Sequence, residues 1–121
     1  MKTILVIEDI QTERQLISAL LSHVGFNVAV ADSAEAAWQW LQNNPSPNLI
    51  LSDIIMPGET GLELCRKVRE NSQLQEIPFV FCSSKSEEFD RFWALRQGAK
   101  DYITKPYTPQ DLLAIVSKNV N

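Results

Sequence analysis

Four ionisable side chains follow directly after short runs of apolar residues. Glu8 and Asp9 come after "TILVI", Asp53 comes after "NLILS", and Lys105 comes after "DYIT". Carboxylates are rarely buried unless they are paired or bind a metal ion. Two more isoleucines follow Asp53 before the turn "MPG" begins, so an acid at this place needs a chemical explanation.

Five apolar runs have the length and composition of buried strands. They are almost continuously apolar rather than alternating, which is typical of a parallel sheet covered on both faces. Segments with apolar residues at helical spacing alternate with these runs. The chain therefore predicts an α/β fold, one open, doubly wound parallel sheet with five helices. The predicted strands are residues 3–7, 27–31, 48–52, 78–82 and 101–104.

The apolar positions of the helical segments predict which side chains are buried. In the first segment the pattern runs from Leu16 to Val24. In the fourth segment Phe89, Phe92 and Trp93 form an aromatic stripe, which we expect in the core. The alternative for this stripe is a surface that binds a partner protein.

Other positions give simpler expectations. Trp38 and Trp40 are two residues apart in a helical segment, so they point to different sides and at least one should be exposed. His23 should lie at the surface, near the end of the first helix. Thr108 followed by Pro109 is a typical start of the last helix.

The acids can converge if the first predicted strand is central and the third lies beside it. Open sheets of this kind bind ligands at the carboxyl ends of their strands, where Glu8, Asp9 and Asp53 would meet. Like charges so close repel each other, and a hard divalent cation such as Mg²⁺ would make them tolerable. With Lys105 and the hydroxyl of Ser83 nearby, the set suits a phosphoryl group, with Asp53 as the nucleophile.

These stretches resemble a known family along essentially the whole chain. "LVIED" (5–9), "LSDIIMPGETG" (51–61), "IPFVFCSS" (77–84) and "GAKDYITKP" (98–106) are similar to the motifs of response-regulator receiver domains, the phosphoacceptor modules of two-component signalling. The resemblance implies a flavodoxin-like sheet with the strand order 2-1-3-4-5. It also implies a histidine kinase or a phosphotransfer protein as the phosphoryl donor.

The resemblance assigns the metal site and the acceptor by position. Asp53 matches the aspartate that accepts the phosphoryl group. Asp9 matches the direct metal ligand, Glu8 the acid that reaches the metal through water, and Ile55 the residue whose backbone carbonyl completes the protein ligands. The implied cofactor is Mg²⁺, for which Mn²⁺ can substitute.

The remaining roles also follow from the resemblance. Ser83 matches the switch hydroxyl, Tyr102 the aromatic residue that changes rotamer, and Lys105 the lysine that pairs with the phosphoryl group. Backbone N–H groups of Ile54 and Ser84 would hold the other phosphoryl oxygens. Signalling would pass through the face built by the fourth helix, the fifth strand and the fifth helix.

Several positions depart from the family pattern. Glu8 replaces the commoner aspartate, Ser83 lacks the methyl group of the usual threonine, and Ser84 stands where alanine is usual. Ile55 and Lys85 occupy the positions of residues that modulate hydrolysis. Because isoleucine cannot orient an attacking water, we expect a fairly long-lived phosphoryl group.

Composition limits the partners. Eleven basic and fifteen acidic residues give a net charge of −4, which argues against binding to nucleic acid or to an anionic membrane surface. No signal peptide is visible, and Cys65 and Cys82 fit no metal spacing or disulfide framework, so we expect two reduced thiols and a cytoplasmic protein.

The expected protein is a stand-alone receiver domain over residues 1–121, not an enzyme. It is expected to be a monomer, with dimerisation on phosphorylation as a possibility. "DIQTER" and "FWALRQGAKDYITKPY" resemble the single receivers of chemotaxis-like systems that control type IV pili in twitching motility or phototaxis. Its first residue, Met1, lies so close to the first strand that a natural beginning is expected.

Three other functions compete with this interpretation. An adaptor that works without phosphorylation would usually have lost an acid or the lysine, and Asp9, Asp53 and Lys105 are all present. An aspartyl-phosphate phosphatase would need a second aspartate two residues after the nucleophile, where Ile55 stands. A flavin-binding module would need a hydroxyl-rich loop after the first strand, and "EDIQTE" offers mostly acids.

Overall fold

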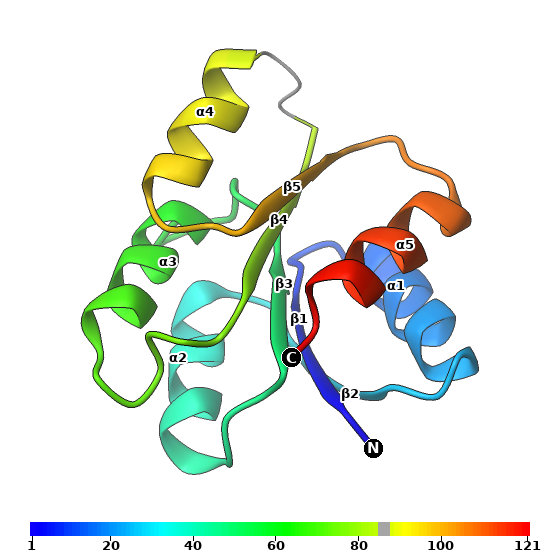
Figure 1. Ribbon diagram of the computed structural model, residues 1–121, viewed down its shortest axis with the longest axis horizontal. Coiled ribbons are helices and arrows are strands. Elements are labelled where there is room, and N and C mark those ends of the chain that lie inside the picture. Colours follow the sequence, from blue (N-terminus) through cyan, green and yellow to red (C-terminus); the bar gives the residue numbers. More distant parts are fainter. Residues whose placement is uncertain (85–87) are drawn as a thin grey trace.

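The computed structural model describes residues 1–84 and 88–121, and its strands form one parallel sheet in the order β2-β1-β3-β4-β5 (Figure 1). All four neighbouring pairs are parallel. The predicted fold class and strand order are therefore confirmed, and no predicted strand limit is wrong by more than one residue. The strands are β1 (Thr3–Ile7), β2 (Asn27–Ala31), β3 (Leu49–Ser52), β4 (Phe79–Ser83) and β5 (Asp101–Thr104).

Helices cover both faces of the sheet, as Figure 1 shows. Two lie on one face and three on the other, as the short crossovers of a doubly wound sheet require. The first face carries α1 (Gln11–His23) and α5 (Pro109–Asn119). The second face carries α2 (Ala34–Asn43), α3 (Gly61–Glu70) and α4 (Glu88–Arg96). None of the helices in the described part of the chain is long and apolar enough to span a bilayer.

The central strand β1 divides the core into two halves. Successive side chains of a strand point to opposite faces, so Leu5 and Ile7 pack with α2 and α3, whereas Ile4 and Val6 pack with α1 and α5. All four side chains are almost fully buried. A strand that is apolar on both faces is thus a direct consequence of its central place in the sheet.

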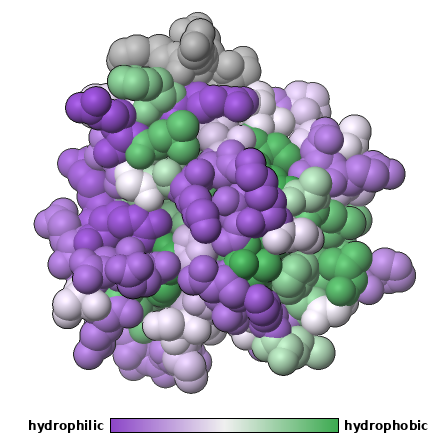
Figure 2. Space-filling model, in the orientation of Figure 1, coloured by the Kyte–Doolittle hydropathy of each residue, from purple (hydrophilic) through white to green (hydrophobic). Residues whose placement is uncertain are grey.

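Two residues of the aromatic stripe of α4, Phe92 and Trp93, are not in the core, so the prediction is wrong for them. Phe92 is 55% exposed and Trp93 is 49% exposed, whereas Ala94 is fully buried. Since α4 covers the edge of the sheet beside β5, only a narrow side of the helix is buried. Apolar residues accordingly interrupt the hydrophilic surface over α4 (Figure 2). The side chain of Phe89 lies outside the described residues.

The buried side of α1 is narrower than its apolar pattern predicts. Ile17 and Leu21 are buried, but Leu16 and Val24 are half exposed. Val24 lies just beyond the end of the helix, which places it in the turn that leads to β2. His23 is the exposed last residue of α1, as predicted.

Neither tryptophan of α2 is fully exposed, contrary to the prediction. Trp38 and Trp40 are both half-buried and pack against the core. The ammonium of Lys67, from α3, lies 4.4 Å from the centre of a Trp38 ring. A neighbouring helix thus covers a side chain that an isolated helix would expose.

The two cysteines are buried and free of disulfides, as expected. Burial raises the pKa of the Cys65 thiol to about 11 and that of the Cys82 thiol to about 12. Both thiols are therefore neutral packing groups.

A capping box at the start of α5 fixes the end of the segment that leads from β5 to this helix. The hydroxyl of Thr108 accepts a hydrogen bond from the backbone N–H of Asp111, and the Asp111 carboxylate accepts one from the backbone N–H of Thr108. This capping box, with Pro109 at the first turn, confirms the predicted helix start. It sets the direction of the chain three residues after Lys105.

Close contact also fixes the segment after β3. The backbone N–H of Gly61 donates a hydrogen bond of 2.8 Å to the carbonyl oxygen of Ile54. A Cβ atom at Gly61 would lie only 2.1 Å from the carbonyl oxygen of Asp53. The start of α3 therefore packs directly on the backbone of Asp53, and only glycine fits there.

We expect the Gly61→Ala substitution to lower the free energy of unfolding by about 3 kcal/mol, because backbone atoms must move apart to admit the methyl group. Urea denaturation measures this loss. Gly25→Ala is the control: its Cβ would meet no heavy atom within 4 Å, and only its positive φ of 101° opposes the change. The control should cost about 1 kcal/mol, so equal losses in the two variants would contradict the contact argument.

Candidate functional site

The register of the sheet brings the predicted acids together. Ile7 of β1 lies opposite Ser52 of β3, and the backbone N–H of Asp53 donates to the carbonyl oxygen of Ile7 at 3.0 Å. One carboxylate oxygen from each of Glu8, Asp9 and Asp53 lies within 4.8 Å of the other two. The predicted convergence of the three acids is thus present, and we call these three residues the acidic cluster.

Lys105 reaches the acidic cluster from the end of β5. Its Nζ forms an ion pair with Glu8 Oε1 and lies 3.0 Å from Asp53 Oδ2. A third carboxylate, that of Glu13 in α1, lies 3.3 Å away. The Lys105 side chain is only 13% exposed. An ammonium has three hydrogens, so each can be directed at a different carboxylate.

The charges in this site are unbalanced. Burial raises the pKa of Glu8 to about 7, although Lys105 acts in the opposite direction. Burial alone would lower the pKa of Lys105, but its hydrogen bonds to Glu8 and Asp53 outweigh burial and raise it. The one ammonium of Lys105 faces the carboxylates of Glu8, Asp53 and Glu13. A set of oxygen ligands with excess negative charge fits a hard divalent cation.

The carboxylate of Asp53 is held by the loop that follows it. Its Oδ1 accepts a hydrogen bond of 2.6 Å from the backbone N–H of Ile54 and a weaker one of 3.4 Å from that of Ile55. The side chain of Ile55 is 56% exposed beside it. The N–H group of Ile54 therefore already points at the atoms to which a phosphoryl group would be attached.

Ser83 and Tyr102 belong to the neighbouring strands β4 and β5. Ser83 is buried at the end of β4, and Tyr102 is buried with its ring centre 6.4 Å from that of Phe81. Burial raises the pKa of Tyr102, while a hydrogen bond to Ser83 lowers it. The structure thus shows the inward position of the aromatic side chain that we predict to change rotamer. Lys85 lies outside the described residues.

Two residues near the acids were not predicted. Glu13 pairs with Lys105, and Arg14 donates a hydrogen bond of 2.8 Å to the carbonyl oxygen of Glu8 and a weaker one of 3.5 Å to that of Asp9. Both belong to the first turns of α1, directly after the acid pair. Their place at the start of that helix is the signal that could have identified them.

A second unpredicted group supports the loop after Asp53. Glu35 of α2 accepts a hydrogen bond of 3.0 Å from the backbone N–H of Glu59, and the Glu59 carboxylate lies 3.5 Å from Lys67 of α3. A Cβ atom at Gly58, whose φ is 82°, would lie 2.8 Å from Glu35 Oε2. This loop is therefore held against α2 by close contact and hydrogen bonding.

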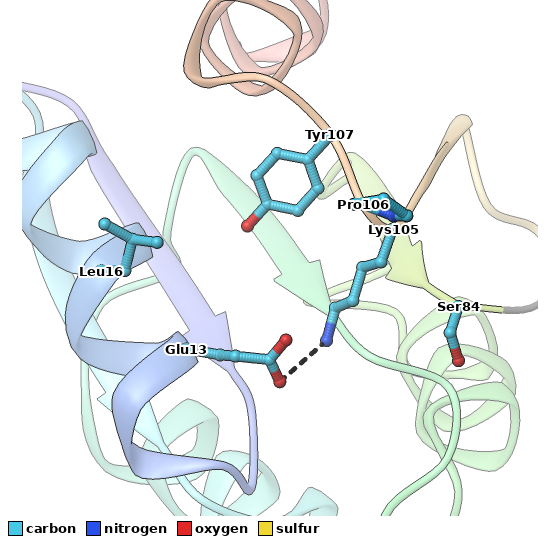
Figure 3. Close-up of a pocket in the computed structure, with 6 residues that line it drawn as sticks. All are labelled: Glu13, Leu16, Ser84, Lys105, Pro106 and Tyr107. Carbon is cyan, nitrogen blue, oxygen red and sulfur yellow. Dashed lines mark hydrogen bonds and ion pairs between the residues drawn. The ribbon is translucent and has the colours of Figure 1, made fainter.

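A pocket of about 390 Å³ lies beside the lysine (Figure 3). In this view the Glu13 carboxylate and the Lys105 ammonium point toward each other from α1 and from the segment after β5. Burial raises the pKa of Tyr107, whose ring stands over the same space. The pocket is lined by Glu13, Leu16, Ser84, Lys105, Pro106 and Tyr107.

Comparison with known families and proteins gives a consistent result. Residues 4–117 match the sequence model described as the response regulator receiver domain. The chain is 37% identical over 113 residues to the phosphate regulon transcriptional regulatory protein PhoB of Escherichia coli, covering 93% of this chain and 49% of PhoB. It thus spans about half the length of that relative. It is 36% identical over 115 residues to the two-component response regulator ORR5 of rice (Oryza sativa subsp. japonica), covering 95% of this chain and 86% of ORR5.

Solved structures agree with the sequence relatives. The chemotaxis response regulator CheY4 of Vibrio cholerae superposes with a TM-score of 0.93 at 27% identity and covers 99% of both chains. The Mn²⁺-bound form of the response regulator Rcp1 superposes with a TM-score of 0.83 at 28% identity, covering 98% of this chain and 91% of Rcp1.

The raised pKa of Glu8 predicts how stability depends on pH in protein kept metal-free with EDTA. The folded protein binds this proton more tightly than the unfolded chain, whose Glu8 has a pKa near 4.5. The stabilisation is complete below that value and is lost as the pH rises through about 7. We expect the free energy of unfolding to fall by about 1–2 kcal/mol between roughly pH 5 and pH 8.

Urea denaturation at several pH values measures this dependence. Glu8→Gln has no titrating group at this position, so its profile should be nearly flat in the same range. If the substitution leaves the slope of the wild-type profile unchanged, another group is responsible.

Proposed function

Because this chain belongs to the family of response regulator receiver domains of two-component systems, we propose that Asp53 accepts a phosphoryl group and that the protein signals by contact with other proteins. Receiver domains are signalling proteins and interact with histidine kinases or phosphotransfer proteins. The observation that supports the proposal most directly is the position of Lys105 Nζ, 3.0 Å from Asp53 Oδ2 beside the acidic cluster.

In the proposed reaction, Asp53 Oδ2 or Oδ1 attacks the phosphorus of a phosphohistidine on the partner. A P–O bond forms, the P–N bond breaks, and the imidazole leaves with the electron pair of that bond. Lys105 balances the negative charge of the transferred group. Ile54, whose N–H already contacts Oδ1, would donate to a phosphoryl oxygen, as would the N–H of Ser84.

The acidic cluster is the proposed Mg²⁺ site, and Mn²⁺ should also bind there. Asp9 and Asp53 would be direct ligands, Glu8 would act through water, and the carbonyl oxygen of Ile55 would complete the set. A divalent cation at this place would stabilise charge on the phosphoryl oxygens. The excess of carboxylates over ammonium groups supports this assignment.

The proposed switch is the pair Ser83 and Tyr102. A phosphoryl group that accepts a hydrogen bond from Ser83 would change the surroundings of the Tyr102 hydroxyl, whose pKa Ser83 lowers. Tyr102 also lies under Arg91 of α4, whose guanidinium carbon is 5.5 Å from the ring centre. A change at Ser83 would therefore shift the population of Tyr102 rotamers and the position of α4.

We propose the face of α4, β5 and α5 as the signalling surface. Phe92, Trp93 and Leu95 of α4 are exposed, and the Arg96 guanidinium lies over the Phe92 ring. Exposed aromatic and arginine side chains are typical of partner-binding surfaces. The exposure of Phe92 and Trp93, which we expected in the core, thus favours the alternative role of this stripe as a surface for a partner.

The process that this protein controls is a separate proposal. The resemblance of two segments to regulators of type IV pili supports a role in motility or phototaxis. Three statements stay predictions. Residues 1–121 act as one receiver domain, the protein is a cytoplasmic monomer, and phosphorylation causes it to dimerise. An adaptor that works without phosphorylation is the main alternative.

Incubation with acetyl phosphate tests the proposed chemistry. Intact mass spectrometry should show one added phosphoryl group when Mg²⁺ is present, and none when Mg²⁺ is removed with EDTA or when Asp53 is replaced (Asp53→Asn). The substitution removes the nucleophile while keeping its size. A folded wild-type protein that gains no phosphoryl group under any of these conditions would favour the adaptor.

The exposed side chain of Ile55 predicts a slow loss of the phosphoryl group. Ile55→Asn supplies an amide that can orient a water molecule, so we expect the phosphoryl group to decay about five- to tenfold faster. The decay is followed by intact mass after removal of acetyl phosphate. Val24→Asn places the same amide at a similarly exposed apolar position away from Asp53 and should leave the half-life unchanged. An unchanged half-life in Ile55→Asn would contradict this role.

A further inference from the structure

The three carboxylates around Lys105 differ in one respect. Glu8 and Asp53 belong to the acidic cluster, whereas Glu13 does not. Glu13 comes from α1, and its side chain is 38% exposed, compared with 2% for Glu8 and 12% for Asp53. Lys105 is therefore shared between two carboxylates that would face a cation and one that would not.

A divalent cation and Lys105 compete for the same oxygen atoms. The ammonium lies 3.0 Å from Asp53 Oδ2 and forms its ion pair with Glu8 Oε1. Positive charges a few ångströms apart repel strongly in a poorly solvated site. Lys105 must therefore give up much of its contact with Glu8 and Asp53 when a cation occupies the cluster, and it then needs another anion.

Glu13 is placed to be that anion. It already lies 3.3 Å from Lys105 Nζ and borders the pocket of about 390 Å³ that adjoins the lysine. Figure 3 shows its carboxylate directed at the ammonium from the first turns of α1. The open space allows the flexible lysine side chain to move toward Glu13 without displacing packed atoms.

We propose that Glu13 is a positioning residue that holds Lys105 while the acidic cluster is occupied by a divalent cation, and that it thereby strengthens cation binding. This inference rests on the proposed cation site. The proposed effect of Glu13 on cation binding differs from a simple effect of its negative charge, because Glu13 acts through its contact with Lys105.

A double-mutant cycle separates the two effects. We would measure Mn²⁺ binding from the electron paramagnetic resonance signal of the free ion, using wild type, Glu13→Gln, Lys105→Met and the double variant. Loss of one negative charge weakens binding in either background, but loss of the lysine's partner matters only when the lysine is present. We expect Glu13→Gln to weaken binding about fivefold more in the wild-type background than in the Lys105→Met background.

Two further variants serve as controls. Glu13→Asp keeps the charge but shortens the side chain, so it should weaken binding nearly as much as Glu13→Gln if contact with Lys105 is required. Glu70→Gln removes a charge from an exposed position at the end of α3 and should have little effect.

A second measurement observes the lysine itself. Nuclear magnetic resonance of the Lys105 ammonium, recorded with Mg²⁺, should show slow hydrogen exchange with water in the wild type. In Glu13→Gln that signal should broaden or vanish once Mg²⁺ is bound, because the ammonium has lost its remaining anion. A merely structural role of Glu13 would leave this exchange rate unchanged.

Each outcome decides a separate point. A larger loss in the wild-type background, with loss of the Lys105 signal, supports the proposal. Equal losses in both backgrounds would overturn the action of Glu13 through Lys105 while leaving the cation site intact. An absence of Mn²⁺ binding in every variant, the wild type included, would overturn the cation site and the inference together.

Discussion

The ammonium of Lys105 is the group on which the arrangement of the site depends. It joins the end of β5 to carboxylates at the ends of β1 and β3 and in α1. Without it, Glu8 and Asp53 would be poorly solvated acids close together, and the charge of Asp53 would oppose the ionisation of Glu8. The capping box at Thr108 and the packing of Gly61 on Asp53 fix the backbone on either side of this contact.

The proposed function requires Lys105 to give up the same contact. A cation in the acidic cluster and a phosphoryl group on Asp53 both change what Lys105 can bind. Part of the stability of the unphosphorylated protein therefore comes from interactions that the proposed function replaces. Such a conflict is expected at functional sites, where local rules of burial and charge are broken and compensated elsewhere. The raised pKa of Glu8 is the measurable sign of it here.

The sequence was sufficient to predict the fold and the central acids because both depend on short-range patterns. Near-continuous apolar runs identify strands, and the residue after each run must lie at the carboxyl edge of a parallel sheet. Glu13 was not predicted because its contact with Lys105 depends on how α1 is rotated against the sheet, which apolar runs do not show. The exposure of Phe92 and Trp93 was missed for a similar reason, since periodicity cannot show that α4 covers only the edge of the sheet.

The exposed aromatic residues of α4 are physically connected to the site. The backbone N–H of Lys105 donates a hydrogen bond of 2.8 Å to the carbonyl oxygen of Ser83, and Ser83 ends the strand that pairs with the strand of Tyr102. Arg91 of α4 stacks on the Tyr102 ring and donates a weak hydrogen bond of 3.4 Å to the hydroxyl of Thr104. Coupling requires an element with two arrangements that both sites favour differently. We propose Tyr102 as that element, because its strand pairs with the strand that ends in Ser83 while its ring supports Arg91 of α4, so a change of its rotamer would alter both surroundings at once.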